Sequence, residues 1–238
     1  MKIALVGYGR MGHEIEKIAL ERGHEISYRI TDTSNEKVSD IRDTDVAIEF
    51  TQPDAAFTNV SSLIKKNIPV ICGTTGWNDN LPQVKKIVSE HNGSFLHSSN
   101  FSIGVNIFFE INKKLAFIMN QFEEYNVSVE EIHHVKKLDA PSGTAVTIAE
   151  HILQNLTRKK SWKLSEDENQ QKEVILVNSI REGDVPGTHS VKYHSEIDDI
   201  EIIHKAHNRK GFAKGAVLAA EWIKDKKGFF NMNDFLKL

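Results

Sequence analysis

A cluster of ionisable side chains in the second half of the sequence has the composition of a proton-transfer site. Two histidines, His133 and His134, are followed closely by Lys136, Lys137 and Asp139. Histidine exchanges protons near neutral pH, and lysine can donate a proton or neutralise an anion. Next to Asp139 and the turn that follows it, Lys137 is favoured over Lys136 as the acting lysine, although spacing alone does not decide between them.

A helix expected over residues 144–156 begins directly after this cluster. Ser142 has the side chain of an N-cap, and the backbone N–H groups of Ser142, Gly143 and Thr144 would lie at the positive end of the helix. Such a group of amides binds carboxylates. Cations beside an anion-binding helix start predict a small substrate that carries more than one carboxylate.

A glycine-rich turn near the N-terminus predicts a dinucleotide site. Its residues are Gly7, Tyr8, Gly9, Arg10, Met11 and Gly12. The turn follows a predicted strand and opens a predicted helix, so its backbone can approach a pyrophosphate closely. Asp32 stands 20 residues after Gly12, where a carboxylate accepts hydrogen bonds from an adenosine ribose. No arginine occurs among residues 33–35 and Arg10 is the nearest candidate cation, which favours NADH, with NADPH as the alternative cofactor.

Small polar residues follow several further predicted strands. Taken singly, each group reads as a turn, and their repetition at successive strand ends is the informative part. In open α/β sheets ligands bind outside the carboxyl ends of the strands. These positions therefore predict the nicotinamide side of the cofactor site: Thr51, Gln52, Gly73, Thr74, Thr75, Ser98, Ser99, Asn100 and Phe101.

A metal site is not expected. Adjacent residues of a strand point to opposite faces, so His133 and His134 would not readily bind one ion. The single cysteine, Cys72, provides no zinc-binding set. The later histidines, His189 among them, are expected mostly to be packing or surface residues, and residues 181–189 to form a turn.

The elements that must position these residues alternate in the first hundred positions. Short apolar runs predict strands at residues 3–6, 25–30, 45–50, 70–72 and 94–97, and apolar spacing predicts helices at 11–21, 54–66 and 81–91. Strands that alternate with helices form parallel βαβ units. The fold class is therefore α/β, with a Rossmann-type doubly wound parallel sheet.

The pattern changes after about residue 101. A helix is expected at 105–119, and strands at 126–132, 173–181, 190–195 and 200–207, with residues 157–172 as a surface loop. A last helix is expected at 215–224. We expect a dinucleotide-binding domain over residues 1–101, completed by 209–238. The second is an α+β domain over 102–208, with a mixed or antiparallel sheet, that binds substrate and mediates oligomerisation.

Composition excludes several classes of protein. The 238 residues carry 30 Lys+Arg against 33 Asp+Glu, so we expect no nucleic-acid partner bound through phosphate neutralisation. The longest uninterrupted apolar runs are five residues, too short to span a membrane. One cysteine and no visible signal peptide favour a cytoplasmic protein.

The segment from residue 131 to residue 145 closely resembles the signature of the dihydrodipicolinate (4-hydroxy-tetrahydrodipicolinate) reductase family. It reads Glu-Ile-His-His-Val-Lys-Lys-Leu-Asp-Ala-Pro-Ser-Gly-Thr-Ala. The similarity extends over nearly the whole chain and includes residues 7–12, 73–76, 100–106, 181–189 and 212–216. The signature is highly specific, whereas the nucleotide turn alone is not.

The resemblance implies a function in lysine and diaminopimelate biosynthesis. NADH or NADPH would reduce a cyclic, unsaturated dicarboxylate to tetrahydrodipicolinate. By analogy, His133 is a proton donor or acceptor and Lys137 a second proton donor, while His134 and the Gly143 and Thr144 amides hold substrate carboxylates. The family also implies a homotetramer assembled through the sheet of the second domain.

Two other functions stay open. Another amino-acid or oxo-acid dehydrogenase would share the nucleotide turn but would not explain the anion-binding helix start after the histidines. A non-catalytic dinucleotide sensor would be expected to lose the cations at positions 133 and 137, which this sequence keeps.

Overall fold

The chain folds into two compact units in a computed structural model, which describes residues 1–165, 172–208 and 210–238. One unit comprises Met1–Ile103 and Lys210–Leu238, and the other comprises Gly104–Arg209. Each unit is described by itself below. Within the described ranges, no helix has the length and apolarity needed to cross a membrane.

The first unit contains a six-stranded sheet in which every neighbouring pair is parallel. The strands lie in the order β11-β5-β4-β3-β1-β2. Their bounds are β1 Lys2–Val6, β2 Glu25–Ile30, β3 Val46–Glu49, β4 Val70–Cys72, β5 Ser94–His97 and β11 Gly228–Phe230. The strand order reverses between β1 and β3, which is the switch point where such sheets bind ligands.

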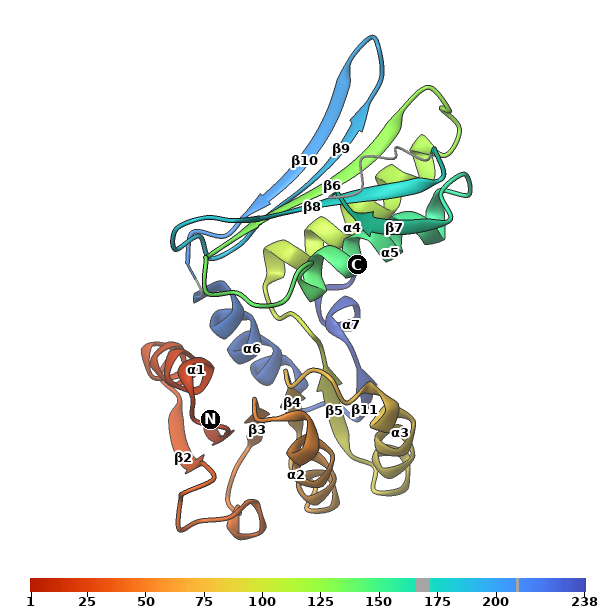
Figure 1. Ribbon diagram of the computed structural model, residues 1–238. Coiled ribbons are helices and arrows are strands. Elements are labelled where there is room, and N and C mark those ends of the chain that lie inside the picture. Colours follow the sequence, from red (N-terminus) through yellow and green to blue (C-terminus); the bar gives the residue numbers. More distant parts are fainter. Residues whose placement is uncertain (166–171, 209) are drawn as a thin grey trace. The chain divides into compact units, whose positions relative to one another are not determined.

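Helices cover both faces of this sheet (Figure 1). One core joins the sheet to the first and last helices, and the other joins it to the two middle helices. Their bounds are α1 Arg10–Glu21, α2 Pro53–Lys65, α3 Leu81–Glu90, α6 Lys210–Ile223 and α7 Met232–Leu236, with short 3₁₀ turns η1 Val38–Asp40 and η2 Asn78–Asn80. Because both faces are covered, the central strands are continuous apolar runs, as the sequence predicted.

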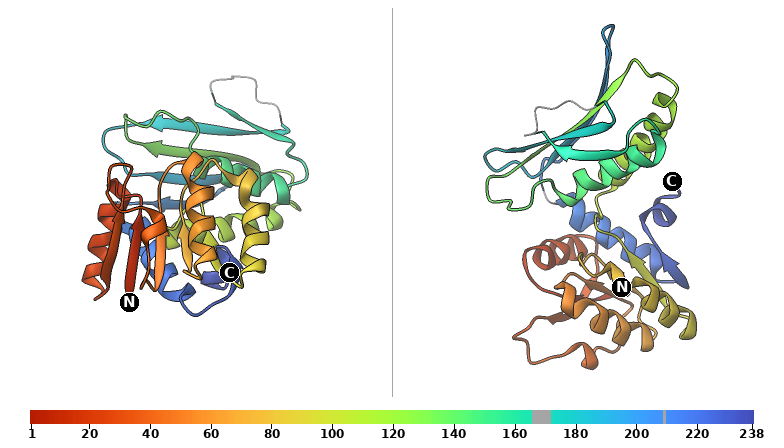
Figure 2. Two further views of the ribbon diagram at one scale, coloured as in Figure 1. Left: turned by 90° about the horizontal axis from the view of Figure 1, so that it is seen from below. Right: turned by 45° about the vertical axis from the view of Figure 1, so that its right-hand side comes forward.

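The second unit contains a mixed five-stranded sheet with its helices on one face (Figures 1 and 2). The strand order is β10-β9-β6-β8-β7. The bounds are α4 Ile103–Met119, β6 Asn126–His133, α5 Gly143–Asn155, β7 Ser161–Leu164, β8 Val174–Arg181, β9 Thr188–His194 and β10 Asp199–Lys205. Side chains of β6 alternate between exposed and buried, which gives the sheet one face toward α4 and α5 and one outer face.

Several sequence expectations are corrected by these elements. The loop expected over residues 157–172 contains strand β7, and its residues 166–171 lie outside the described ranges. Of the two arrangements expected for the second sheet, the mixed one is confirmed: β6 pairs antiparallel with β9 but parallel with β8, because α5 lies in the crossover between β6 and β8. Strand β11 and helix α7 were not predicted, and α6 begins at Lys210 rather than at residue 215.

Candidate active site

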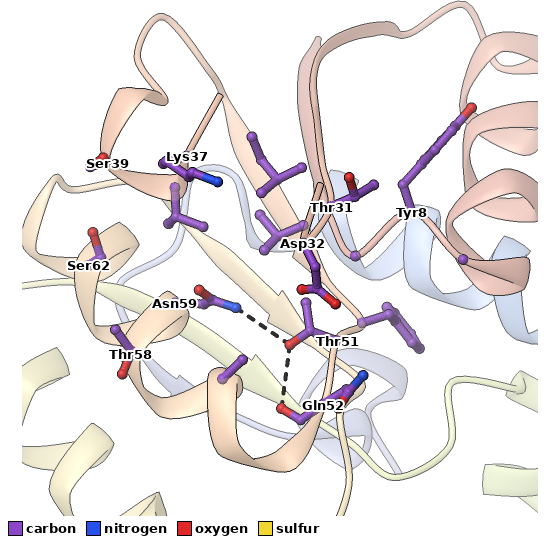
Figure 3. Close-up of a pocket in the computed structure, with 17 residues that line it drawn as sticks. Tyr8, Thr31, Asp32, Lys37, Ser39, Thr51, Gln52, Thr58, Asn59 and Ser62 are labelled. Atoms are coloured by element: carbon purple, nitrogen blue, oxygen red, sulfur yellow. Dashed lines mark hydrogen bonds between the residues drawn. The ribbon is translucent and has the colours of Figure 1, made fainter. Parts of the chain in front are cut away.

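A cavity of about 740 Å³ lies at the switch point of the first unit. Residues that follow β1, β2 and β3 line it, together with the first turns of α2 (Figure 3). Gly7, Gly9 and Asp32, all predicted cofactor residues, are part of this lining. Its position and lining suit the adenosine half of a dinucleotide.

The three glycines of the nucleotide turn are needed for different physical reasons. A Cβ at Gly7 would lie 2.0 Å from the backbone oxygen of Phe50, and Gly7 has a φ of +92°. A Cβ at Gly12 would lie 2.6 Å from the backbone oxygen of Gly7. At Gly9, the N-cap of α1, no protein atom lies within 4 Å of an added Cβ. Gly7 and Gly12 are thus required by the fold, whereas the space at Gly9 is available to a ligand.

A second cavity of about 390 Å³ continues from the same turn. Its lining includes the predicted residues Gly9, Arg10, Met11, Gly12, Gly73, Thr74 and Thr75. The structure therefore brings the nucleotide turn and the end of β4 to one place, as strand-end reasoning predicted.

A buried carboxylate that sequence reasoning missed holds these strand ends together. Glu49, fully buried at the end of β3, accepts hydrogen bonds from the hydroxyls of Thr51 and Thr74, the latter at 2.7 Å. The Thr74 hydroxyl in turn accepts from the backbone N–H of Thr51 at 2.8 Å. The Cys72 thiol donates to Glu49 at 2.9 Å, and burial and this carboxylate raise the pKa of the thiol well above its ordinary value. The network fixes the loops that line both cavities.

The predicted residues after β5 line neither of these two cavities. Ser98 accepts a hydrogen bond from the backbone N–H of Asn100 at 3.1 Å, which forms a tight turn that includes Ser99. Phe101 is only 2% exposed and belongs to the hydrophobic core beside α6. Its side chain has a packing role in this structure.

In the second unit, three ionisable side chains converge on the face of the sheet that α4 and α5 cover. The Oε2 atom of Glu131 lies 3.5 Å from Nε2 of His133 and 3.6 Å from Nε2 of His189, and the two nitrogens are 3.4 Å apart. All three residues are nearly or fully buried. The later histidines were expected mostly to be packing or surface residues; His189 is buried, and its ring is part of this polar cluster.

Ser142 caps α5, as the sequence predicted. Its hydroxyl accepts from the backbone N–H of Ala145 at 3.2 Å, and its own backbone N–H donates to Glu131 at 3.0 Å. The first helical residues, Gly143 and Thr144, thus begin α5 immediately beside the buried carboxylate. Burial alone would raise the pKa of Glu131, but hydrogen bonds from His133, His189, Ser142 and Ser179 outweigh it and lower the pKa far below its ordinary value.

Lys137 lies at the edge of the same cluster. Its ammonium donates to both oxygens of Asp139, at 2.8 and 2.7 Å, and it contributes to lowering the pKa of His189, whose main cause is burial. The Arg181 guanidinium donates to the backbone oxygens of Lys137 and Asp139 and so fixes the loop. His134 follows the end of β6 and is half-buried.

Sequence reasoning missed Lys37, Glu131 and His189. Lys37 lines the larger cavity together with Asp32, and it lies just after residues 33–35, where no arginine occurs. His189 is 56 residues from His133, and strand register alone brings them together. Glu131 had one available signal, since it shares a face of its strand with His133.

The donor atoms of Glu131, His133 and His189 are close enough for one small cation to touch all three. No other set of three such side chains has this geometry among residues 1–165, 172–208 and 210–238. The guanidinium of Arg181 already lies 3.2 Å from Oε1 of the same carboxylate. A positive charge is thus in place without a metal.

Family models match both parts of the chain. Residues 1–101 match the model described as dihydrodipicolinate reductase, N-terminus, and residues 104–236 match the model described as its C-terminus.

Curated relatives bear one name. The chain is 49% identical over 237 residues to a 4-hydroxy-tetrahydrodipicolinate reductase from Christiangramia forsetii, covering 99% of the chain and 98% of the relative. A protein of that name from Methanococcus aeolicus is 33% identical, with 98% and 82% covered.

Solved structures agree on the fold. A dipicolinate-bound dihydrodipicolinate reductase from Paenisporosarcina sp. TG-14 has a TM-score of 0.76 at 20% identity, with 97% of each chain covered. A myo-inositol dehydrogenase from Corynebacterium glutamicum has a TM-score of 0.56 at 14% identity, with 96% and 90% covered. At these identities the likeness concerns the fold alone.

Proposed function

This chain belongs to the dihydrodipicolinate reductase family, and we propose that it reduces 4-hydroxy-tetrahydrodipicolinate to tetrahydrodipicolinate in lysine and diaminopimelate biosynthesis in the cytoplasm. One observation carries the proposal most directly. The buried cluster of His133, His189 and Glu131 adjoins the capped start of α5, so proton-transfer groups lie beside an anion-binding helix end. A small dicarboxylate reduced at its ring is the substrate that this combination suits.

The reaction consumes one hydride and one proton, and the hydroxyl of the substrate leaves as water. His133 exchanges a proton with the substrate, and Lys137 is the second proton donor. The ion pair between Lys137 and Asp139 fixes the direction of the Lys137 side chain. Arg181 fixes the loop and thereby the position of both.

The substrate carboxylates bind at the start of α5. The backbone amides of Gly143 and Thr144 lie at the positive end of the helix, and Ser142 holds that end in place through its cap. His134 contributes a side chain from the loop after β6. These groups orient the substrate ring beside His133 and Lys137.

The first unit binds the cofactor through the glycine turn and Asp32. The residues present fit a dinucleotide, because the space beside Gly9 at the N-terminus of α1 is open. No protein atom lies within 4 Å of the Cβ position there, so a pyrophosphate can approach the backbone. The bound nicotinamide nucleotide supplies the hydride. Thr74 and Thr75, at the end of β4, line the smaller cavity and orient its nicotinamide side.

NADH is the preferred cofactor, and NADPH is accepted through Lys37. The Asp32 carboxylate suits a ribose with two free hydroxyls. Figure 3 shows the Lys37 side chain among those that line the same cavity as Asp32, where an ammonium can pair with a 2′-phosphate. We expect Lys37→Ala to raise KM for NADPH by about tenfold, as for one lost charge-assisted contact, and to leave KM for NADH within about twofold. Equal effects on both cofactors would contradict this assignment.

The enzyme assembles as a homotetramer through the outer face of the second sheet. Helices α4 and α5 cover only one face, and the other presents Ile132, Leu176, Ile180 and Ile203 between polar neighbours. Ile203 is 59% exposed in the single chain. We expect a tetramer by light scattering, and a smaller species for Ile203→Glu, which places a charge on this face. A wild-type monomer would refute the assembly.

The activity is tested by generating the substrate in place. Pyruvate and aspartate semialdehyde are condensed by the preceding synthase, and nicotinamide absorbance is followed with NADH and NADPH in parallel. Oxidation that needs both the synthase and this protein supports the reductase. Cofactor binding without oxidation would instead favour another oxo-acid substrate or a non-catalytic sensor.

A further inference from the structure

Strand register places four polar side chains in one cross-strand row of the second sheet. Glu131 on β6 pairs with Ser179 on β8 and with His189 on β9, and His189 pairs with His204 on β10. The row lies on the face that packs against α4 and α5, where apolar residues occupy the neighbouring rows. Buried polar groups of this kind must find hydrogen-bond partners within the protein.

Glu131 is the centre of this row. Its Oε1 atom accepts from the Ser179 hydroxyl and from Arg181 at 3.2 Å. Both carboxylate oxygens lie within 3.1 Å of the Ser142 backbone nitrogen. Its Oε2 atom faces the Nε2 atoms of His133 and His189. A single carboxylate therefore contacts the proton-transfer imidazole and the start of the substrate-binding helix at once.

The packing leaves the His133 imidazole little freedom. A Cβ at Gly187 would lie 3.0 Å from Cε1 of the His133 ring, so the backbone just before β9 lies close against the edge of that ring. His189 stands at the ring in a T-shaped contact, with centroids 5.1 Å apart. The ring can keep its orientation only if its buried nitrogen has a fixed partner, and Oε2 of Glu131 occupies that direction.

We propose that Glu131 is the positioning residue of the active site. His189 shares the Oε2 atom of Glu131 with His133, and the carboxylate and the two imidazoles together hold one proton that is available to His133. This inference rests on the proposed reductase function. The guanidinium of Arg181 balances the carboxylate on its other oxygen, which favours a hydrogen-bonded arrangement over a bound cation.

The charges around the two imidazoles determine how activity depends on pH. The groups that face the cluster are Arg181 from β8, His204 from β10, and Lys137 with Asp139 from the loop. Within the cluster itself, Glu131 is the buried negative charge, and it favours a protonated imidazole. Removing that charge therefore disfavours the protonated form of the imidazole. Activity that needs a proton on this pair would then fall away at a lower pH in the variant, by about one pH unit or more.

Glu131→Gln is the main test, because glutamine keeps an oxygen for the Ser142 N–H but loses the charge. Glu130→Gln is the matched control, since Glu130 is next in sequence, points to the outer face and accepts from Asn178 at 2.9 Å. His189→Gln is the second variant, and His194→Gln, an exposed histidine on the same strand, is its control. Each variant is measured in the full-length protein for thermal unfolding, NADH Kd, kcat, KM and the pH dependence of kcat.

We expect both Glu131→Gln and His189→Gln to lower kcat by about tenfold to a hundredfold. Glu131→Gln should shift the alkaline limb of the pH profile downward, because a negative charge beside His133 is lost. His189→Gln should shift it upward, because Oε2 of Glu131 then serves His133 alone. NADH Kd should stay within twofold, because the cofactor residues belong to the first unit. If Glu131→Gln does not fold, His189→Gln carries the test through its own, upward shift. A fall in kcat without any shift of the pH profile would overturn the proposal in favour of a purely structural role.

Two further outcomes keep the inference separate from the proposed function. An inactive wild-type enzyme in the coupled assay would refute the function itself, whereas an active wild type with unaltered Glu131→Gln kinetics refutes only the positioning role. Loss of wild-type activity on dialysis against a chelator, restored by zinc, would assign the three side chains to a metal and also overturn the proposal.

Discussion

Gly9 is the position where cofactor binding and folding can be separated most cleanly. It is the N-cap of α1, with a φ of −85° that any residue adopts, and no protein atom lies within 4 Å of an added Cβ. Alanine therefore meets no steric obstacle in the free protein. Alanine is a poorer N-cap than glycine by about 0.5–1 kcal/mol, which for a chain of this size lowers Tm by about 1–4 °C.

The effect on the cofactor should be larger. A methyl group at Gly9 holds a pyrophosphate away from the N-terminus of α1 and weakens about one hydrogen bond to a charged group, worth about 1.5–3 kcal/mol. NADH Kd should accordingly rise about tenfold to 150-fold. Titration of NADH fluorescence against Gly9→Ala measures it. Gly211→Ala is the control, because its Cβ would meet only Ser102 Oγ at 3.8 Å, and its Kd should match the wild type.

Two results would refute this reasoning. An NADH Kd within threefold of the wild type would show that the backbone at Gly9 does not approach the cofactor. A Tm lowered by more than about 10 °C would show that the space around Gly9 is needed for folding, in conflict with the observed geometry.

Three further variants test other parts of the structure. Lys137→Ala should leave NADH binding intact but lower kcat by about 10²-fold or more, with Lys136→Ala as the control, and unchanged turnover would remove Lys137 from the mechanism. Burial lowers the pKa of His151 from 6.5 to about 4, so the unfolded chain binds more protons between those values, and unfolding free energy should fall as pH drops from 7 to 4. His151→Gln should flatten that dependence in urea titrations, and an unaltered slope would contradict the lowered pKa. Gly215→Ala should destabilise the protein by about 2 kcal/mol or more in the same titrations, because its Cβ would lie 1.8 Å from the backbone oxygen of Phe101, and wild-type stability would disprove that close contact.

Local pattern was sufficient to predict the parallel sheet and the capped helix. Apolar runs that end at glycine or at small polar residues mark buried strands whatever surrounds them, and a serine before a helical segment needs only its own backbone to cap it. Strand ends of a parallel sheet meet at one edge, so Gly9 and Thr74 could be assigned to one site without coordinates. Strand β7 was missed, because its four residues alternate polar and apolar side chains over too short a stretch to stand out within a polar segment, and pairing with β8 holds it in place.

The residues 131–145 carried by themselves the chemistry of the second unit, because proton donors and a helix start are neighbours in sequence there. Only the tertiary structure showed that His189 belongs with His133, and that Glu49 and Glu131 are the buried carboxylates that organise each site. These contacts depend on strand order and register, which pair residues far apart in the chain. A one-residue change of register would turn His189 to the opposite face of the sheet, and that choice is made by packing of the whole unit rather than by any local segment.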